Sequence, residues 1–145
     1  MKEKFTMKQR VKILCTFAII LGLFSCKEEM TKQTLGADYY LMGYKENPAS
    51  FKVVHSIGDN FEDVVLGEIV DYDSDPYFVL IHRRITDKAK ALFEEHKLWQ
   101  KQSQGVDQYW IIEKRFDGIT GPLNYQEYLV KRKQLQISDG VKIRQ

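Results

Sequence analysis

The chain has 145 residues, with 22 lysines and arginines against 20 aspartates and glutamates. This length suits one ordinary domain, and the near balance of charge gives no basic surface of the kind that nucleic acid requires. The first 25 residues hold five of the basic residues and one acidic residue, so the rest carries 17 basic and 19 acidic residues. We therefore expect no nucleic-acid partner.

The N-terminal segment has the pattern of an export signal. Basic residues lead into a mostly apolar run over residues 11–24. The part from Ile13 to Ser25 has 13 residues, whereas a transmembrane helix needs about 20. A positive head, a short apolar core and a small residue at the end predict a cleaved signal peptide over residues 1–25. Met7 opens an equally good signal, which leaves Met1 and Met7 open as the start.

The end of this segment, Leu23-Phe24-Ser25-Cys26, resembles the lipobox of bacterial lipoproteins. The resemblance implies cleavage before Cys26 and acylation of its thiol, and two or more acyl chains anchor a protein far better than one. The alternative is an ordinary signal peptide with an incidental cysteine. We expect a lipid anchor at Cys26 in the outer membrane of the cell envelope.

The charged residues 27–29 follow Cys26 directly and are similar to a surface-export signal of some Bacteroidetes. A solvated tether would have the same composition, so both a periplasmic and a surface-facing position stay open. We expect residues 26–37 to be the lipidated cysteine and a polar tether, followed by one domain over residues 38–145. Cys15 leaves with the signal, so no cysteine remains for a disulfide or a thiol site.

The first half of the domain alternates apolar and polar residues, which predicts strands. We expect strands over residues 38–45, 51–56, 64–72 and 77–81, with a bulge at Gly67. The last of these is apolar on both faces, which is typical of a central strand. We expect turns at residues 46–48, 58–60 and 71–76.

The second half predicts two helices around a strand. Residues 87–104 have helical spacing, with Thr86 or Asp87 as cap and Gly105 as stop. A strand over 109–113 and a hairpin turn at 117–118 follow. Asn124 and Glu127 then form a capping box for a closing helix that ends near Gly140. We expect an α+β fold with a mainly antiparallel sheet of about five strands, two helices and a loose C-terminal end.

The C-terminal third carries a second resemblance. The segments Tyr109-Trp110-Ile111-Ile112, Gly121-Pro122-Leu123 and Tyr125-Gln126-Glu127-Tyr128 resemble a small Bacteroidetes-type lipoprotein family of unknown function. Its members end in a YWII-type strand, a GPL-type turn and a closing helix. The resemblance implies a lipoprotein, and it implies no activity and no site residues.

The histidines are the first candidates for a site. His55 and His82 lie on predicted strands, and if these strands pair the two imidazoles would meet and hold a metal. A pair of histidines that lie at the solvent edge or are hydrogen-bonded is the alternative that we favour. His96 falls on the apolar face of the first predicted helix, where a place at the edge of the core is the simplest interpretation.

Charged clusters are the other candidates. Asp71, Asp73 and Asp75 suggest calcium, but the positions where an EF-hand needs glycine and glutamate hold Pro76 and His82. We therefore expect a solvated turn. Residues 131–133 are basic and lie near the end of the closing helix, where positive charges interact favourably with the helix dipole. The alternatives to this capping role are binding of nucleic acid or of lipid headgroups. We predict no catalytic residue, cofactor or metal.

Three functions remain open. The favoured one is a non-enzymatic accessory or binding module of the envelope, for which Tyr39, Tyr40 and Tyr44 are either interface or packing residues. The second is a small inhibitor or immunity lipoprotein with a protruding loop at residues 71–76. A hydrolase that uses His55 and His82 is the least favoured. Only Cys26 is predicted to be functional, as the lipidation site.

Overall fold

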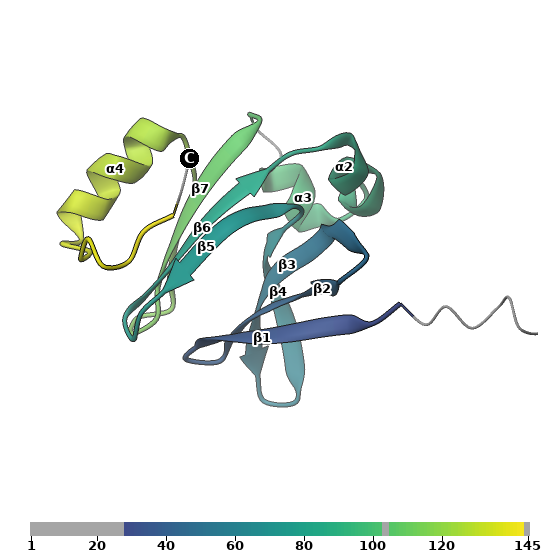
Figure 1. Cartoon of the computed structure of the whole chain (residues 1–145), viewed down its shortest axis with the longest axis horizontal. Helices are drawn as coiled ribbons and strands as arrows, with labels where there is room; N and C mark the ends of the chain where they lie inside the picture. The colour runs from purple at the N-terminus through teal and green to yellow at the C-terminus, as the bar shows by residue number, and fades with distance from the viewer. Residues whose placement is uncertain (1–27, 103–104, 144–145) are drawn as a thin grey trace, which may run out of the picture.

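The computed structural model describes residues 28–102 and 105–143 of the chain (Figure 1). Cys26 and the predicted signal peptide lie outside the described residues. The first sheet consists of β1 (Met30–Gly36), β2 (Tyr39–Tyr44), β3 (Asn47–Ile57) and β4 (Asn60–Leu66). The second consists of β5 (Ile69–Ser74), β6 (Phe78–Arg84), β7 (Asp107–Glu113) and β8 (Gly118–Leu123). The helices are α2 (Asp87–Phe93), α3 (Lys97–Gln102) and α4 (Tyr125–Gln134).

All neighbouring strands in both sheets are antiparallel. The predicted α+β class, the mainly antiparallel pairing and the single small domain are therefore confirmed. The predicted numbers of about five strands and two helices are wrong, because the described residues form eight strands in two sheets and three helices.

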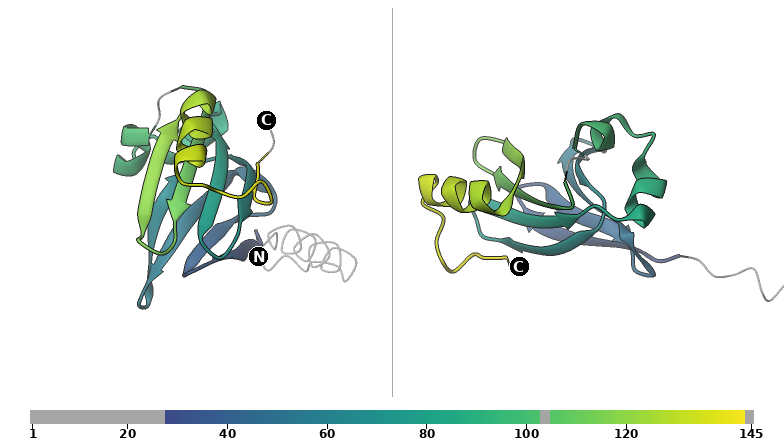
Figure 2. Two further views of the ribbon diagram at one scale, coloured as in Figure 1. Left: turned by 90° about the vertical axis from the view of Figure 1, so that its left-hand side faces the viewer. Right: turned by 90° about the horizontal axis from the view of Figure 1, so that it is seen from above.

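Three apolar clusters hold the layers together. The largest lies between the two sheets, where Tyr39, Leu41 and Val53 of the first meet Ile81, Trp110 and Ile112 of the second. Helix α4 covers the other face of the second sheet through a cluster that includes Tyr109 and Tyr128. Helices α2 and α3 cover one end of the first sheet through Leu66, Ala89 and Trp99. Figure 2 shows α4 and the α2–α3 pair at opposite ends of the domain.

The predicted tether is shorter than expected, because its residues 30–36 form β1 and pair with β2. This edge strand is mostly exposed on both faces, and only Leu35 is fully buried. A strand without a continuous buried face has no apolar alternation for sequence analysis to detect. The ordered domain therefore begins at about Met30 rather than residue 38.

The predicted strand over residues 64–72 is two strands in different sheets. Gly67 separates β4 from β5 with a φ of 104°, and a Cβ there would lie 2.7 Å from the Trp99 ring. The chain therefore turns from one sheet to the other at Gly67 instead of forming a bulge. The acidic turn predicted over residues 71–76 is also wrong, because residues 71–74 belong to β5 and the turn comes after Ser74.

The predicted helix over residues 87–104 is broken between Phe93 and Lys97. The His96 Nδ1 atom accepts a hydrogen bond from the Leu98 N–H at 3.2 Å, which starts α3 in a new direction. The Thr86 cap is confirmed, since its hydroxyl accepts from the Ala89 N–H.

The turn predicted at residues 46–48 is displaced, because β3 begins at Asn47. Pro48 is tolerated in this strand because β4 pairs with β3 only from Lys52 onward.

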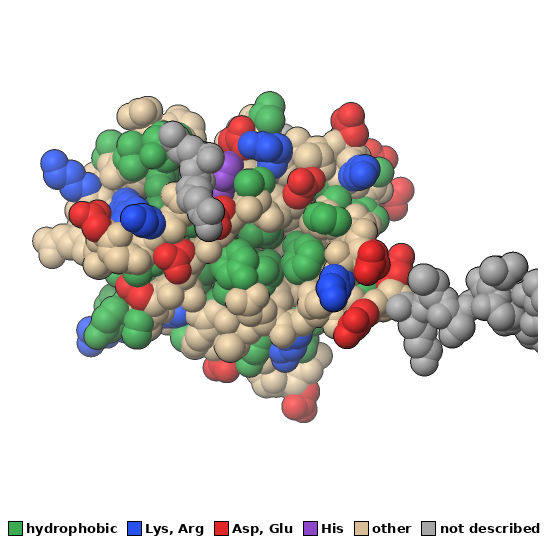
Figure 3. Space-filling view, viewed as in Figure 1, with side chains coloured by type: hydrophobic (Ala, Val, Ile, Leu, Met, Phe, Trp, Pro, Cys, Tyr) green, Lys and Arg blue, Asp and Glu red, His purple; other side chains and the backbone are tan. Residues whose placement is uncertain are grey.

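The predicted ends of the domain have mixed outcomes. The capping box of Asn124 and Glu127 is confirmed, and so is the hairpin turn before β8. Helix α4, however, ends at Gln134 rather than near Gly140. The end that was predicted to be loose after Gly140 is packed at Val141, which is buried in the cluster beneath α4 together with Ile137; residues 144–145 lie outside the described residues. In Figure 3, acidic and basic side chains alternate around a central group of hydrophobic ones, so this face carries no large field of one sign.

Candidate functional site

The strongest candidate site is a groove on the face of the first sheet that points away from the second sheet. It has a volume of about 600 Å³, within the range of roughly 300–1,000 Å³ that is usual for small-molecule sites. We call it the outer groove. Its apolar walls come from all four strands of the first sheet and from α2: Met30, Met42, Val54, Phe61, Leu92 and Phe93.

Strand periodicity explains why apolar side chains gather here. Tyr39 and Leu41 of β2 point into the cluster between the sheets, so Met42 and Tyr44 must point to the opposite face. Met42 pairs with Lys52 across β2 and β3. Helix α2 closes one side of the outer groove with Leu92 and Phe93, at its C-terminal end.

A small set of polar groups lines the outer groove. The Lys52 Nζ atom lies 2.6 Å from one oxygen of Asp63, and the His96 Nε2 atom lies 3.2 Å from the other. The Ser50 hydroxyl accepts from the Tyr44 N–H at 2.8 Å and donates to the Asn47 carbonyl at 2.6 Å. Such fixed polar groups in an apolar groove orient a ligand.

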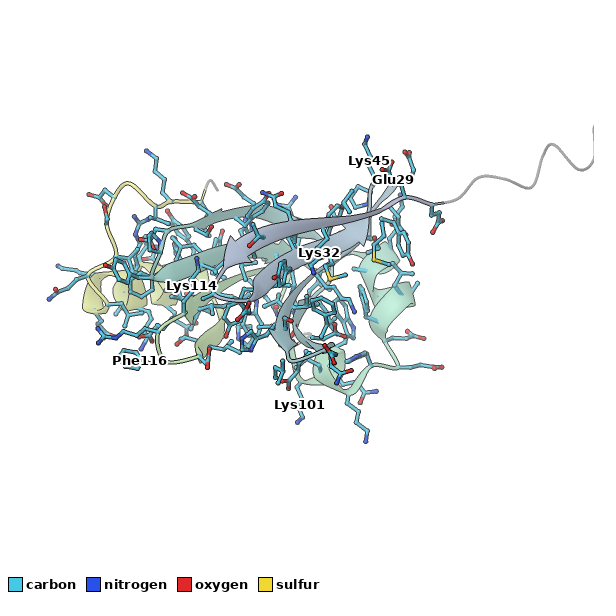
Figure 4. The ribbon with its side chains drawn as sticks, turned by 90° about the horizontal axis from the view of Figure 1, so that it is seen from below. Glu29, Lys32, Lys45, Lys101, Lys114 and Phe116 are labelled. Carbon is cyan, nitrogen blue, oxygen red and sulfur yellow. The ribbon has the colours of Figure 1, made fainter. Side chains whose placement is uncertain are left out.

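The rim of the outer groove is aromatic and basic. The Lys32 ammonium lies 4.0 Å from the centre of the Tyr40 ring and 4.4 Å from that of Phe61. The two rings meet edge to face, with centroids 5.8 Å apart. Figure 4 shows the position of Lys32 on β1. Met30, Phe61 and Leu92 are 56%, 45% and 51% exposed, so the rim presents apolar surface to the outside.

The structure does not bring His55 and His82 together. His55 lies on β3 and stacks on Tyr39, a member of the cluster between the sheets. His82 lies on β6 and stacks on Tyr109, a member of the cluster beneath α4. The two imidazoles therefore lie on opposite faces of the second sheet. No group of three or more metal-ligating side chains occurs among residues 28–102 and 105–143.

His55 instead lines a second cleft of about 450 Å³, near the edges of both sheets. Its Nε2 atom is 4.0 Å from Asp117, whose carboxylate also accepts a hydrogen bond from the Tyr39 hydroxyl at 3.4 Å. Burial, together with the charge and hydrogen bond of Asp117, raises the pKa of Tyr39 to about 12. Tyr39 is therefore a neutral donor at ordinary pH.

His82 takes part in a separate polar group on the second sheet. Its Nε2 atom and the Arg84 Nε atom each lie 3.0 Å from the same oxygen of Asp107. Burial alone would raise the pKa of Asp107, but the hydrogen bonds from His82 and Arg84 outweigh it and lower that pKa. The group joins β6 to β7 and fixes the His82 ring.

The remaining sequence candidates have structural partners. His96 is not on an apolar helix face, because it lies between α2 and α3 with its side chain 43% exposed. Asp73 and Asp75 accept hydrogen bonds from backbone N–H groups, the first from Ser74 and Lys142 and the second from Tyr77 and Phe78. In the basic run, the Arg132 guanidinium donates to the Val141 carbonyl at 2.6 Å and so ties the C-terminal segment to α4.

The inhibitor hypothesis expected a protruding loop at residues 71–76. Most of this segment is strand β5, and Asp75 closes the tight turn into β6.

Sequence reasoning also missed the polar pair Lys52 and Asp63. The alternation of Met42 and Tyr44 indicated an outward face of β2, but the pairing that places Lys52 beside it was not visible from the sequence.

The C-terminal pattern has its counterpart in a known family. The sequence profile of a family described as "Protein of unknown function (DUF3997)" matches residues 36–145. The chain belongs to the DUF3997 family. This confirms the predicted resemblance to a domain family of unknown function, and the DUF3997 match includes β2 to β8 and all three helices. No curated protein and no solved structure matches the chain. None of the helices in residues 28–102 and 105–143 is long and apolar enough to cross a bilayer.

Proposed function

We propose that this DUF3997 protein is an exported, lipid-anchored binding module of the bacterial cell envelope that holds an apolar ligand in the outer groove. The observation that carries the binding role is the groove itself, with apolar walls and the fixed pair Lys52 and Asp63. The lipobox-like residues 23–26 support the anchor. The Bacteroidetes-type outer-membrane location, in a periplasmic or surface-facing orientation, is part of the same proposal.

The groove has the composition of a binding site for flexible hydrocarbon. Met30 and Met42 have unbranched, polarisable side chains that adapt to irregular ligands. Phe61 and Phe93 supply rigid apolar walls. Lys52 and Asp63 lie together in the wall, so an amphiphile would place a polar group near this pair and its apolar part along the methionine and phenylalanine side chains.

The anchor is tested by metabolic labelling with an alkyne analogue of palmitate. The wild-type protein should incorporate the label, and Cys26→Ala should lose it. Cys15→Ala is the matched control, because Cys15 lies within the predicted signal and should leave labelling unchanged. Label that persists in Cys26→Ala would overturn the lipid anchor at this position.

The ligand is tested by native mass spectrometry of the mature protein released from mild detergent. The wild-type protein should carry a non-covalent adduct. Leu92→Glu places a charge at the groove wall and should lower adduct occupancy at least fivefold. Val130→Glu is the control, because Val130 is a similarly exposed apolar residue on a helix, 57% against 51%, and lies on α4. Equal occupancy in the two variants would contradict a ligand in the outer groove.

A further inference from the structure

The corrected start of β1 places the domain very close to its proposed anchor. Only Lys27, Glu28 and Glu29 separate Cys26 from Met30, the first residue of β1. Four residue steps span at most about 14 Å even when the chain is fully extended. A tether over residues 26–37 would have let the domain tumble freely above a membrane, whereas this short connection keeps the start of β1 at the bilayer surface.

The outer groove lies at this same end of the domain. Glu28 and Met30 both line it, so the groove begins where the chain comes from the anchor. In Figure 1 the N-terminal end of β1 and helix α2 are at one end of the molecule, and α4 is at the other. The end that the anchor holds at the bilayer is therefore the end that carries the groove.

The rim of the groove has the chemistry of a membrane interface. Met30, Phe61 and Leu92 are about half exposed and would be covered by lipid. The Lys32 ammonium lies over the Tyr40 and Phe61 rings, so its charge and the aromatic surface are presented together. Aromatic and lysine side chains favour the headgroup region, where the apolar part is buried and the charge meets phosphate.

Acidic groups at the groove do not oppose this orientation strongly. Asp63 is neutralised by Lys52 at 2.6 Å and contacts His96 at 3.2 Å. Glu28 and Glu29 are exposed and lie in or beside the connection to the anchor, where their carboxylates can stay in water. Lys32 on β1 and Lys45 in the turn between β2 and β3 are also exposed.

We infer that the outer groove opens onto the bilayer that carries the Cys26 anchor and takes an acyl chain of a phospholipid from it. Phe61 and Leu92 then lie in the acyl-chain boundary, and Lys32 faces a lipid phosphate. This inference rests on the proposed lipid anchor and names the ligand of the proposed groove. The short connection after Cys26 favours the bilayer over a second copy of the chain, since the groove is presented to lipid first.

The experiment uses single introduced cysteines, because Cys26 is the last cysteine of the sequence and its thiol is consumed by acylation in the proposed anchor. Phe61→Cys and Leu92→Cys place an NBD fluorophore at the groove. Phe116→Cys and Val130→Cys are controls at exposed apolar positions, 74% and 57% exposed, away from the groove. Figure 4 shows Phe116 at the end of the domain opposite the incoming chain. The full mature protein is placed in vesicles of phosphatidylethanolamine and phosphatidylglycerol.

Doxyl-labelled phospholipid in these vesicles should quench NBD at positions 61 and 92 at least threefold more than at positions 116 and 130. Equal quenching at the four positions would overturn the inference. So would water-like emission at 61 and 92 combined with disulfide-linked dimers of Leu92→Cys, which would assign the groove to a second copy. The protein without an introduced cysteine should take up no NBD; if it does, Cys26 is free and the proposed anchor itself fails.

Discussion

The guanidinium of Arg83 donates a hydrogen bond to the side-chain oxygen of Gln108 in the interior of the domain, where the two residues are 0% and 2% exposed. The same guanidinium donates to the Leu66 carbonyl and, at 2.6 Å, to the Gln102 carbonyl. These neutral acceptors belong to β4, α3 and β7. Burial lowers the pKa of Arg83 to about 10, yet its cation still joins both sheets and a helix.

Replacement of Arg83 should therefore destabilise the protein strongly. Arg83→Met removes the hydrogen bonds that this guanidinium donates to the buried oxygens of Leu66, Gln102 and Gln108, which should cost about 3–5 kcal/mol of unfolding free energy. Arg84→Met is the control, because the Arg84 side chain is 47% exposed and its ion pair with Asp107 is worth at most about 1 kcal/mol. Urea unfolding of the purified protein measures both, and equal losses would contradict the role of Arg83.

The buried Tyr39 hydroxyl should make the protein sensitive to alkali. Its pKa is raised from 10.0 to about 12, so the unfolded chain loses this proton at a lower pH than the folded one. The contribution of Tyr39 to the unfolding free energy is therefore fully present below pH 10. It falls by up to about 2–3 kcal/mol as the pH rises through 12. Tyr39→Phe should flatten this decline, whereas Tyr40→Phe, on the opposite face of β2, should retain it. Unchanged pH dependence in Tyr39→Phe would refute the assignment.

The sequence predicted those elements whose signals are local. Asn124 and Glu127 form the capping box because both partners lie within one turn of helix. β6 was predicted as a central strand because it is apolar on both faces, and it does lie between β5 and β7. β1 was missed because an exposed edge strand has only Leu35 to bury.

The candidate site was hidden for a different reason. The groove forms only when Met42 of β2, Phe61 of β4 and Leu92 of α2 come together, and these residues are far apart in the chain. The histidines were easier to notice, but His55 and His82 are held by different aromatic partners on different sheets. The presence of histidines suggested a metal site, whereas the pairing of distant strands determines where the outer groove lies.

The hydrogen-bonded group around Asp107 should stabilise the folded protein mainly at pH values above the usual pKa of an aspartate. Its pKa is lowered in the folded protein, where the hydrogen bonds from His82 and Arg84 outweigh burial. The folded chain therefore gives up this proton more readily, and the stability gained is lost as the pH falls through the folded pKa. Asp107→Asn should weaken the acid dependence of unfolding measured by circular dichroism. Asp59→Asn, in the exposed turn after β3, should leave it as in the wild type; equal curves for both variants would count against the group.

The close approach of Gly121 to Trp110 gives the last prediction. A Cβ at Gly121 would lie 2.4 Å from the Trp110 ring, and the φ of 151° also disfavours other residues. Since Trp110 is packed between the sheets and cannot move aside, Gly121→Ala should cost about 2–3 kcal/mol. Gly58→Ala is the control: its φ is 61°, but nothing lies within 4 Å of the added carbon, so only backbone strain of about 1 kcal/mol is expected. Thermal unfolding should separate the variants, and a Gly121→Ala protein as stable as Gly58→Ala would show that the ring yields.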